Sequence, residues 1–246
     1  MDVKKTEIRS ALALGITLLL PWAVLLALWP KQAVTAEGLV ELEVEEPPLI
    51  ALTFDDGPRR STTTDLLDGL ALRGVKATFF LVGEMIPGNE DLVERMADEG
   101  HQIGVHTYDH RKLTALNATD FAAQIGRTQD MLAGITGMDS FFLRPPYGMV
   151  DNGVKKRAGV PIILWSIDPE DWNDKNVDRI VEHIVSNAQD GDIILLHDIY
   201  QTSVEAALRV VDALHEKGFL FVTVEELAGQ RHVDLIPGEV YRGFQP

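Results

Sequence analysis

Two adjacent carboxylates, Asp55 and Asp56, lie in the stretch 53–58 that follows an apolar run at 49–52, and they directly precede a Gly-Pro pair. The apolar run is typical of a buried strand, and the Gly-Pro pair predicts a turn. Neighbouring side chains at a strand end point in different directions, so one carboxylate can hold a metal while the other faces a substrate. Because like charges this close repel each other, the pair also favours a bound cation.

Two histidines, His106 and His110, are four residues apart. In a helical turn this spacing places both imidazoles on one side. One aspartate and two histidines are a common ligand set for a divalent metal that keeps positions open for water and substrate. Since the chain has no cysteine, disulfides and thiolate metal sites are excluded. An aspartate that binds no metal could then act as a general base.

Two further residues could assist such a site. Arg144 directly precedes a Pro-Pro pair and could hold the base in its ionised form. His197 ends the apolar run 193–196, and a histidine at the mouth of a buried strand suits a general acid. A nearby carboxylate such as Asp171 would raise the pKa of this histidine toward working pH.

The elements that must position these residues alternate along the chain. Strands are predicted at 49–54, 76–82, 102–106, 141–144, 162–167, 193–197 and 219–224, and helices at 64–73, 90–99, 119–135, 152–158, 177–188 and 204–217. Alternation without an internal repeat predicts a parallel sheet covered by helices. About seven strand–helix units favour a complete or incomplete (β/α) barrel, whose active site lies at the carboxyl ends of the strands.

The chain resembles the polysaccharide deacetylase (NodB-homology) family, carbohydrate esterase family four. Five segments between about Leu49 and Leu227 carry the resemblance, in the family's order: Thr-Phe-Asp-Asp-Gly-Pro at 53–58, His-Thr-Tyr-Asp-His at 106–110, Arg-Pro-Pro-Tyr-Gly at 144–148, Asp-Pro-Glu-Asp-Trp at 168–172 and Leu-Leu-His at 195–197. Val105, where many members have asparagine, is a departure that touches no catalytic role. The resemblance implies a distorted (β/α) barrel.

The resemblance also implies a role for each matched residue. Asp55 would be the general base and Arg144 would orient it, while Asp56, His106 and His110 would bind the metal.

His197 would be the general acid. Asp171 would tune it, with Asp168 as the alternative. The substrate would be bound by the backbone N–H of Tyr147, which would help to hold the oxyanion, and by Trp172 and Leu195, which would enclose the acetyl methyl group.

The implied activity is hydrolysis of N-acetyl groups on the N-acetylglucosamine of a cell-wall polysaccharide. Peptidoglycan is the expected substrate, with chitin oligomers and O-acetylated xylan as alternatives. Zinc is the expected ion, with cobalt or manganese as alternatives. Non-haem iron oxygenases also use two histidines and one carboxylate, but they usually show a β-sandwich pattern that this chain lacks. A non-catalytic glycan-binding module is disfavoured because both Asp55 and His197 are present.

The N-terminal segment predicts a membrane location. Lys4, Lys5 and Arg9 precede a charge-free apolar stretch at 11–29. As a helix, residues 11–30 would span about 30 Å, the thickness of a hydrocarbon core, with the N-terminus in the cytoplasm and the rest outside. We therefore expect a signal-anchor at 1–30, an acidic linker at 31–48, the catalytic domain at 49–227 and a C-terminal tail at 228–246. The alternative is a signal peptide cleaved at the small residues 34–36.

The formal net charge of −16, without any basic run, argues against a nucleic-acid partner. An outward-facing, membrane-held domain favours peptidoglycan among the candidate glycans. The sequence carries no signal for the oligomeric state.

Overall fold

The computed structural model describes residues 46–246. The predicted signal-anchor and most of the predicted linker lie outside these residues. Among the helices of the described part, none is long and apolar enough to cross a membrane.

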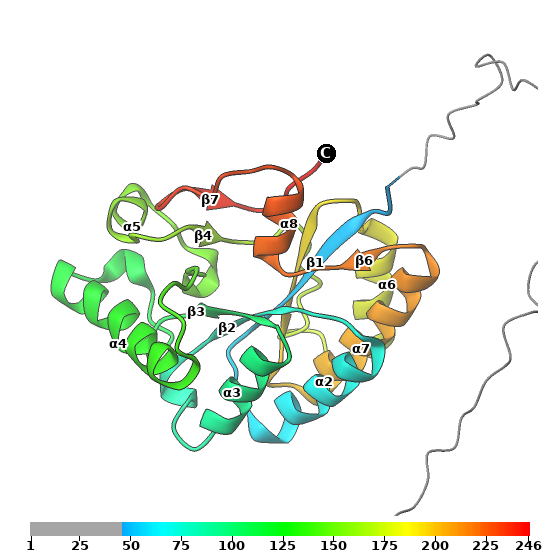
Figure 1. The fold of residues 1–246 in the computed structure, drawn as a ribbon, viewed down its shortest axis with the longest axis horizontal. Helices are drawn as coiled ribbons and strands as arrows, with labels where there is room; N and C mark the ends of the chain where they lie inside the picture. Colours follow the sequence, from blue (N-terminus) through cyan, green and yellow to red (C-terminus); the bar gives the residue numbers. More distant parts are fainter. Residues whose placement is uncertain (1–45) are drawn as a thin grey trace, which may run out of the picture. The chain divides into compact units, whose positions relative to one another are not determined.

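The main sheet is parallel and is centred on β1 (Figure 1). Its strands are β1 (Leu49–Asp55), β2 (Thr78–Leu81), β3 (Gln102–Val105), β5 (Asp192–His197) and β6 (Leu220–Phe221). The order is β3-β2-β1-β5, so β5 pairs with one edge of β1. The other edge is shared, because β6 pairs with the start of β1 and β2 with its end. The prediction of an α/β fold with a parallel sheet is confirmed.

Single bridges extend the pairing beyond the sheet. Leu143 bridges both Val105 of β3 and Ile162 of β4 (Ile162–Ile163), and Ile167 bridges Ile194 of β5. The predicted strands 141–144 and 162–167 are therefore shorter than expected. The first cannot continue because Pro145 and Pro146 have no N–H to donate.

The predicted strand 219–224 is also shorter, because a helix begins inside it. Thr223 opens α8 (Val224–Gln230) with a capping box. Its hydroxyl accepts the N–H of Glu226 at 3.1 Å, and the Glu226 carboxylate accepts the N–H of Thr223 at 2.9 Å. This reciprocal pair stabilises the first turn of a helix and ends the strand.

The helices form a row around the strands (Figure 1). Each helix contacts the next in the order α6, α7, α2, α3, α4, α5. Their bounds are α2 (Arg60–Arg73), α3 (Glu90–Asp98), α4 (Ala118–Thr136), α5 (Asn152–Arg157), α6 (Val177–Asn187) and α7 (Gln201–Glu216). All six were predicted, with α2 and α7 beginning earlier than expected.

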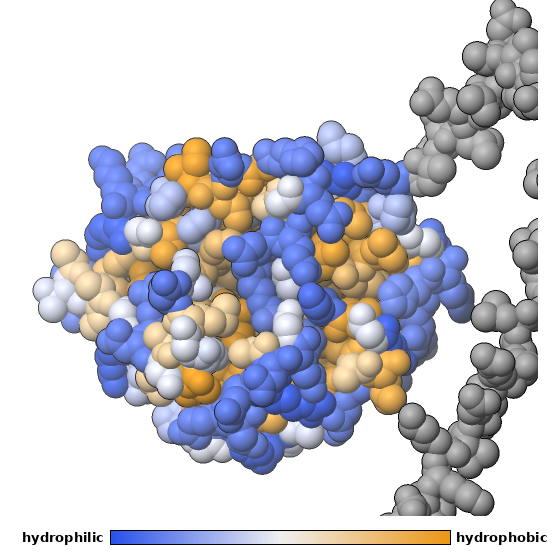
Figure 2. Space-filling view, viewed as in Figure 1, coloured by the Kyte–Doolittle hydropathy of each residue, from blue (hydrophilic) through white to orange (hydrophobic). Residues whose placement is uncertain are grey.

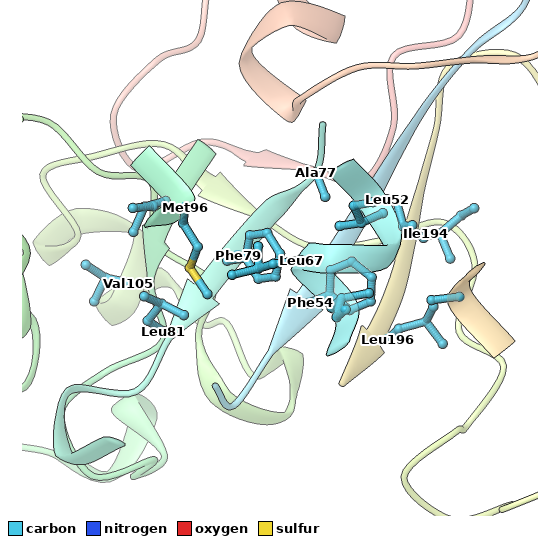
Figure 3. Close-up of a cluster of buried hydrophobic side chains, with 14 of the residues drawn as sticks. Leu52, Phe54, Leu67, Ala77, Phe79, Leu81, Met96, Val105, Ile194 and Leu196 are labelled. Atoms are coloured by element: carbon cyan, nitrogen blue, oxygen red, sulfur yellow. The ribbon is translucent and has the colours of Figure 1, made fainter. Parts of the chain in front are cut away.

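Side chains of β1 alternate between two apolar cores. Leu52 and Phe54 belong to the core between the sheet and the helices, where Phe54 stacks on Phe79 at 5.3 Å between ring centroids (Figure 3). Leu49 and Ala51 belong to the second core on the opposite face. Because the alternation has a period of two, Asp55 shares the face of Ala51 and not that of Phe54.

The same alternation holds in β5. Ile194 and Leu196 point into the helix-side core, and Ile193 points into the second core. His197 therefore faces the same side as Asp55. The two residues are direct partners in the β1–β5 ladder.

The segment predicted as a C-terminal tail is built into the same fold. β7 (Val240–Tyr241) pairs with β4, and Phe244 is buried in the second core. The N–H of Phe244 donates to the carbonyl of Gly191 at 2.7 Å. Gly191 has φ +89°, and a Cβ there would collide with the Phe244 backbone. The predicted boundary at Leu227 falls inside α8.

The surface seen in Figure 2 is hydrophilic over much of its area, in keeping with the formal charge of −16. Several large apolar side chains are exposed on separate elements, among them Leu72 and Ile236, and such scattered residues are ordinary. Tyr147 and Trp172 differ, because these two exposed aromatic residues line one cavity.

Candidate active site

A cavity of about 370 Å³ lies at the carboxyl ends of β1, β3 and β5. It is lined by Asp55, Asp56, His106, His110, Tyr147, Trp165, Asp168, Trp172, Leu195, His197 and Tyr200. The strand ends therefore bring together side chains that are far apart in the sequence.

Asp55 is held by a fully buried arginine. Nη1 of Arg144 donates to Asp55 Oδ1 at 2.8 Å and to Thr53 Oγ1 at 2.7 Å. The other guanidinium nitrogens donate to the carbonyls of Ile163 at 3.1 Å and Leu164 at 2.9 Å. Burial lowers the pKa of Arg144, while the Asp55 charge opposes this shift. Since a buried ion pair needs such full hydrogen bonding, the arginine fixes the orientation of Asp55.

Asp56, His106 and His110 form a cluster that fits a divalent metal. Asp56 Oδ1 lies 3.5 Å from His106 Nε2 and 3.3 Å from His110 Nε2, and the three candidate ligand atoms all lie within 4.8 Å of one another. Asp56 Oδ1 is buried and has no hydrogen-bond partner within residues 46–246. A buried carboxylate oxygen without a donor is costly, and a cation at this point would satisfy it.

The backbone at Asp56 turns its carboxylate toward the histidines. Asp56 has φ +75°, a left-handed conformation that is uncommon outside glycine. This bend lets Asp56 reach the cluster although Asp55 directly precedes it on the strand. Asp55 Oδ2 remains nearby, 3.6 Å from His106 Nε2.

The helical turn that would place both imidazoles on one side is not formed at His106 and His110. They lie in a loop, with φ +66° at Thr107 and φ +58° at His110. Gln124 Oε1 accepts the backbone N–H groups of the two residues after Thr107, at 3.0 and 3.2 Å, which keeps them from helical bonding. The rings nevertheless converge, with centroids 4.9 Å apart.

Hydrogen bonding fixes the tautomer of His106. Its Nδ1 lies 2.6 Å from the carbonyl oxygen of Arg144. A carbonyl only accepts, so Nδ1 carries the hydrogen and Nε2 keeps its lone pair for a metal. Burial, together with the neighbouring His106, lowers the pKa of His110, which favours the neutral imidazole that metals bind.

His197 is paired with a buried carboxylate. The ring nitrogen Nδ1 of His197 lies 2.8 Å from Asp171 Oδ1, and the backbone N–H of His197 donates to Asp171 Oδ2 at 2.9 Å. Burial opposes the charged imidazole, but the hydrogen bond and charge of Asp171, helped by Asp55 and Asp56, raise the pKa of His197 to about 9. Asp168 instead accepts the N–H of Glu170 at 2.8 Å. The structure thus brings Asp171, rather than Asp168, onto the histidine.

The three predicted substrate-binding residues all line the cavity. Tyr147 has φ +62°, and its ring packs edge-on against His110 at 4.7 Å between centroids. Trp172 is half exposed at 51%, whereas Leu195 is buried. The cavity wall therefore combines a buried aliphatic side chain with two accessible aromatic rings.

Three residues of the site were not singled out from the sequence. Thr53, a partner of Arg144, could have been found because it shares the Asp55 face by alternation. Tyr200 lies three residues beyond the strand end at His197, and its ring lies 3.1 Å below Lys175 Nζ. Trp165 lies in a stretch where the predicted strand breaks, so no alternation could orient it.

Known proteins resemble this chain over most of the described part. The family model for polysaccharide deacetylase matches residues 43–161. Peptidoglycan-N-acetylglucosamine deacetylase PgdA of Listeria monocytogenes (strain 10403S) is 42% identical over 182 residues, which are 74% of this chain and 39% of PgdA. This chain therefore matches about two fifths of the length of PgdA. A peptidoglycan-N-acetylglucosamine deacetylase of Bacillus cereus (strain ATCC 14579) is 38% identical over 209 residues, 79% of this chain and 95% of the relative.

Solved structures share the fold. The peptidoglycan deacetylase PdaC from Bacillus subtilis is 38% identical with a TM-score of 0.73, covering 76% of this chain and 94% of that one. A family 4 acetyl xylan esterase from Clostridium thermocellum, solved with a cobalt ion, is 28% identical with a TM-score of 0.76, covering 79% of this chain and 98% of that one.

Replacing Asp171 with asparagine should move the alkaline limb of the pH–rate profile toward lower pH. The general acid works only while protonated, and Asp171 is the strongest influence that raises the pKa of His197. Without that charge, burial dominates and the proton is lost at lower pH. A cation bound at Asp56 would offset part of the local negative charge, but replacing Asp171 would still lower the pKa of His197.

The measurement is kcat/KM against pH for Asp171→Asn, with Asp168→Asn as the matched control. The control should leave the alkaline limb in place, whatever its effect on the rate. A limb that moves in Asp168→Asn and not in Asp171→Asn would assign the tuning role to Asp168.

Proposed function

The chain belongs to the polysaccharide deacetylase family, and we propose that it is a metal-dependent hydrolase that removes N-acetyl groups from the N-acetylglucosamine of peptidoglycan. One observation carries the proposal: three kinds of group meet in one cavity. They are the Asp56–His106–His110 cluster, a carboxylate held by a buried arginine, and a histidine paired with a buried aspartate.

The residues divide the chemistry between a base and an acid. Arg144 holds one oxygen of Asp55, so Oδ2 is free to accept a proton beside the cluster. When bound, a divalent cation would lower the pKa of a water ligand and polarise the substrate carbonyl. His197, with its pKa raised to about 9, stays protonated at neutral pH and can give a proton to the leaving nitrogen. Arg144 thus orients Asp55 as the base, and Asp171 supports the protonated form of His197 as the acid.

The walls of the cavity suit an acetylated sugar. Leu195 and Trp172 offer apolar surface for the acetyl methyl group. The backbone N–H of Tyr147 is our candidate for the oxyanion, because Tyr147 lies beside the metal ligand His110. The exposed rings of Tyr147 and Trp172 line the cavity and can contact a sugar.

Peptidoglycan is preferred because the relatives from Listeria and Bacillus are named for it. Acetylated xylan remains the second candidate, favoured by the structural likeness to the acetyl xylan esterase. Chitin oligomers are the third. The parallel α/β sheet gives no support to an oxygenase of the β-sandwich kind.

Zinc is our proposed ion, with cobalt or manganese as alternatives. The two neutral imidazoles and one carboxylate suit all three, and the cobalt ion in the esterase supports this set. We also propose that the strands and the bridges at Leu143, Ile162 and Ile167 together form a distorted (β/α) barrel.

Acetate release tests the function directly. The protein should release acetate from peptidoglycan faster than from chitin oligomers or acetylated xylan. Chelation should abolish release, because the proposed reaction needs a metal at the cluster. Zinc, cobalt or manganese should restore release, because one Asp and two His suit all three ions. Faster release from xylan would reassign the substrate. A metal-loaded protein inactive on all three glycans would point to a binding module.

Replacing each of the two adjacent aspartates with asparagine should reduce activity for a different reason. Asp55→Asn keeps the shape but cannot take up a proton, and loss of a general base costs about 10²–10⁴-fold in rate while metal binding survives. Asp56→Asn replaces a charged ligand with a neutral one, so metal affinity should fall and excess metal should partly restore turnover.

Metal affinity and turnover, titrated with metal, are measured for both variants. Metal loss in Asp55→Asn with metal retention in Asp56→Asn would reverse the two roles. Wild-type binding and turnover in both variants would place the site elsewhere.

We further propose that the N-terminal segment holds the protein at the membrane with the catalytic domain outside the cytoplasm. The support is the Lys4, Lys5 and Arg9 flank before the apolar stretch 11–29. Cell fractionation should recover the full-length chain with the membrane. A chain that begins near Glu37 in the medium would instead indicate a cleaved signal peptide.

A further inference from the structure

Asp198 is a buried carboxylate that the proposed chemistry does not use. It is 1% exposed and directly follows His197, the last residue of β5. His197 faces the cavity, whereas Asp198 points to the opposite side, where its partner Thr63 lies in α2. A carboxylate buried to this degree is costly unless it is hydrogen-bonded, so its contacts indicate what it does.

The contacts of Asp198 lead to the turn that carries Asp56. Asp198 Oδ2 accepts a hydrogen bond from Thr63 Oγ1, which in turn accepts the backbone N–H of Arg59 at 2.8 Å. The carboxylate also lies against Gly57, where an added Cβ would collide with both of its oxygens. Gly57 is thus required for close approach, and the turn rests directly on Asp198.

The second oxygen of Asp198, Oδ1, also lies against Gly57. Oδ1 is buried and has no hydrogen-bond partner in the described part of the chain. Burial raises the pKa of Asp198 to about 7, and the charge of Asp56 adds to this rise. The two carboxylates therefore lie close enough to interact through the turn.

Asp56 depends on contacts outside the sheet. The β1–β5 ladder ends at the Asp55–His197 pair, so Asp56 is the first residue beyond it, and its left-handed φ is unfavourable for a non-glycine residue. A second link joins the same two segments, because Nη1 of Arg59 donates to the carbonyl of Ile199 at 3.1 Å. That link is exposed, whereas the Asp198 link is buried.

We propose that Asp198 is a positioning residue that seats the Asp56–Gly57 turn against the end of β5. Seated in this way, Asp56 Oδ1 meets the two histidines of the cluster and stays in a fixed place relative to His197. The inference rests on the proposed function for the reaction that the metal would serve. The effect that it predicts is on the affinity of the free protein for a metal ion, which is measured without that reaction.

The test is Co²⁺ affinity, measured by titration calorimetry on folded, metal-free protein. Asp198→Ala should weaken affinity by roughly tenfold or more, the usual effect of removing a group that supports a metal ligand. Asp198→Asn should stay close to wild type, because its amide oxygen can still accept the Thr63 hydroxyl. Turnover with saturating Co²⁺ should recover partly in Asp198→Ala.

Thr63 supplies a second pair of variants in case Asp198→Ala does not fold. Thr63→Val keeps the shape but removes the donor to Asp198, and should weaken Co²⁺ affinity. Thr63→Ser keeps the hydroxyl and should not.

Asp192→Ala is the matched control. Asp192 is buried at the other end of β5, where it accepts the N–H of Gln189 at 2.8 Å and Nε2 of Gln245 at 3.2 Å. Its loss should lower the Tm but leave Co²⁺ affinity unchanged.

Wild-type Co²⁺ affinity in folded Asp198→Ala, or in Thr63→Val where the alanine variant does not fold, would overturn the inference. Equal weakening in Asp192→Ala would overturn it too, because the effect would then be general destabilisation. A wild-type protein that binds Co²⁺ but releases no acetate would refute the proposed function and leave this comparison of affinities intact.

Discussion

The buried ion pair between Arg144 and Asp55 is the interaction on which the rest of the site depends. A fully buried guanidinium is tolerable only when its donors are satisfied, and here they reach β1 on one side and the carbonyls of Ile163 and Leu164 on the other. The backbone of Arg144 adds a third link, because its carbonyl accepts His106 Nδ1. One residue thus fixes the orientation of Asp55, sets the tautomer of His106 and joins the ends of β1 and β3 to the segment at 163–164.

The period of two in the parallel strands sorts the remaining groups. Asp55 and His197 end neighbouring strands as direct partners and face the cavity, while Phe54 and Leu196 face the helices. The sheet alone therefore places the proposed base and the proposed acid side by side. It does not deliver Asp56, which lies one residue beyond the ladder and needs a left-handed turn to reach the histidines.

This division explains what the sequence could predict. Long apolar runs such as 193–196 predict strands well, because a central parallel strand is buried on both faces. Leu143 and Ile167 lie in predicted strands but pair only through single bridges, because an apolar pattern does not show where the pairing stops. The loop at His106–His110 depends on Gln124, which lies farther along the chain, so spacing alone suggested a helical turn that does not exist. The contact between Phe244 and Gly191 likewise joins residues that are far apart in the sequence, so no local pattern could predict it.

The charges of the site show why a cation belongs to it. Four carboxyl groups lie at or beside the cavity, those of Asp55, Asp56, Asp168 and Asp171, and they outnumber the cationic groups of Arg144 and protonated His197. Such a site would repel the negative charge that develops on a carbonyl oxygen during attack. A divalent cation at Asp56 would offset this excess of negative charge, which favours the oxyanion. The ion pair fixes the orientation of Asp55, but the balance of charge in the cavity depends on whether a cation occupies the cluster next to it.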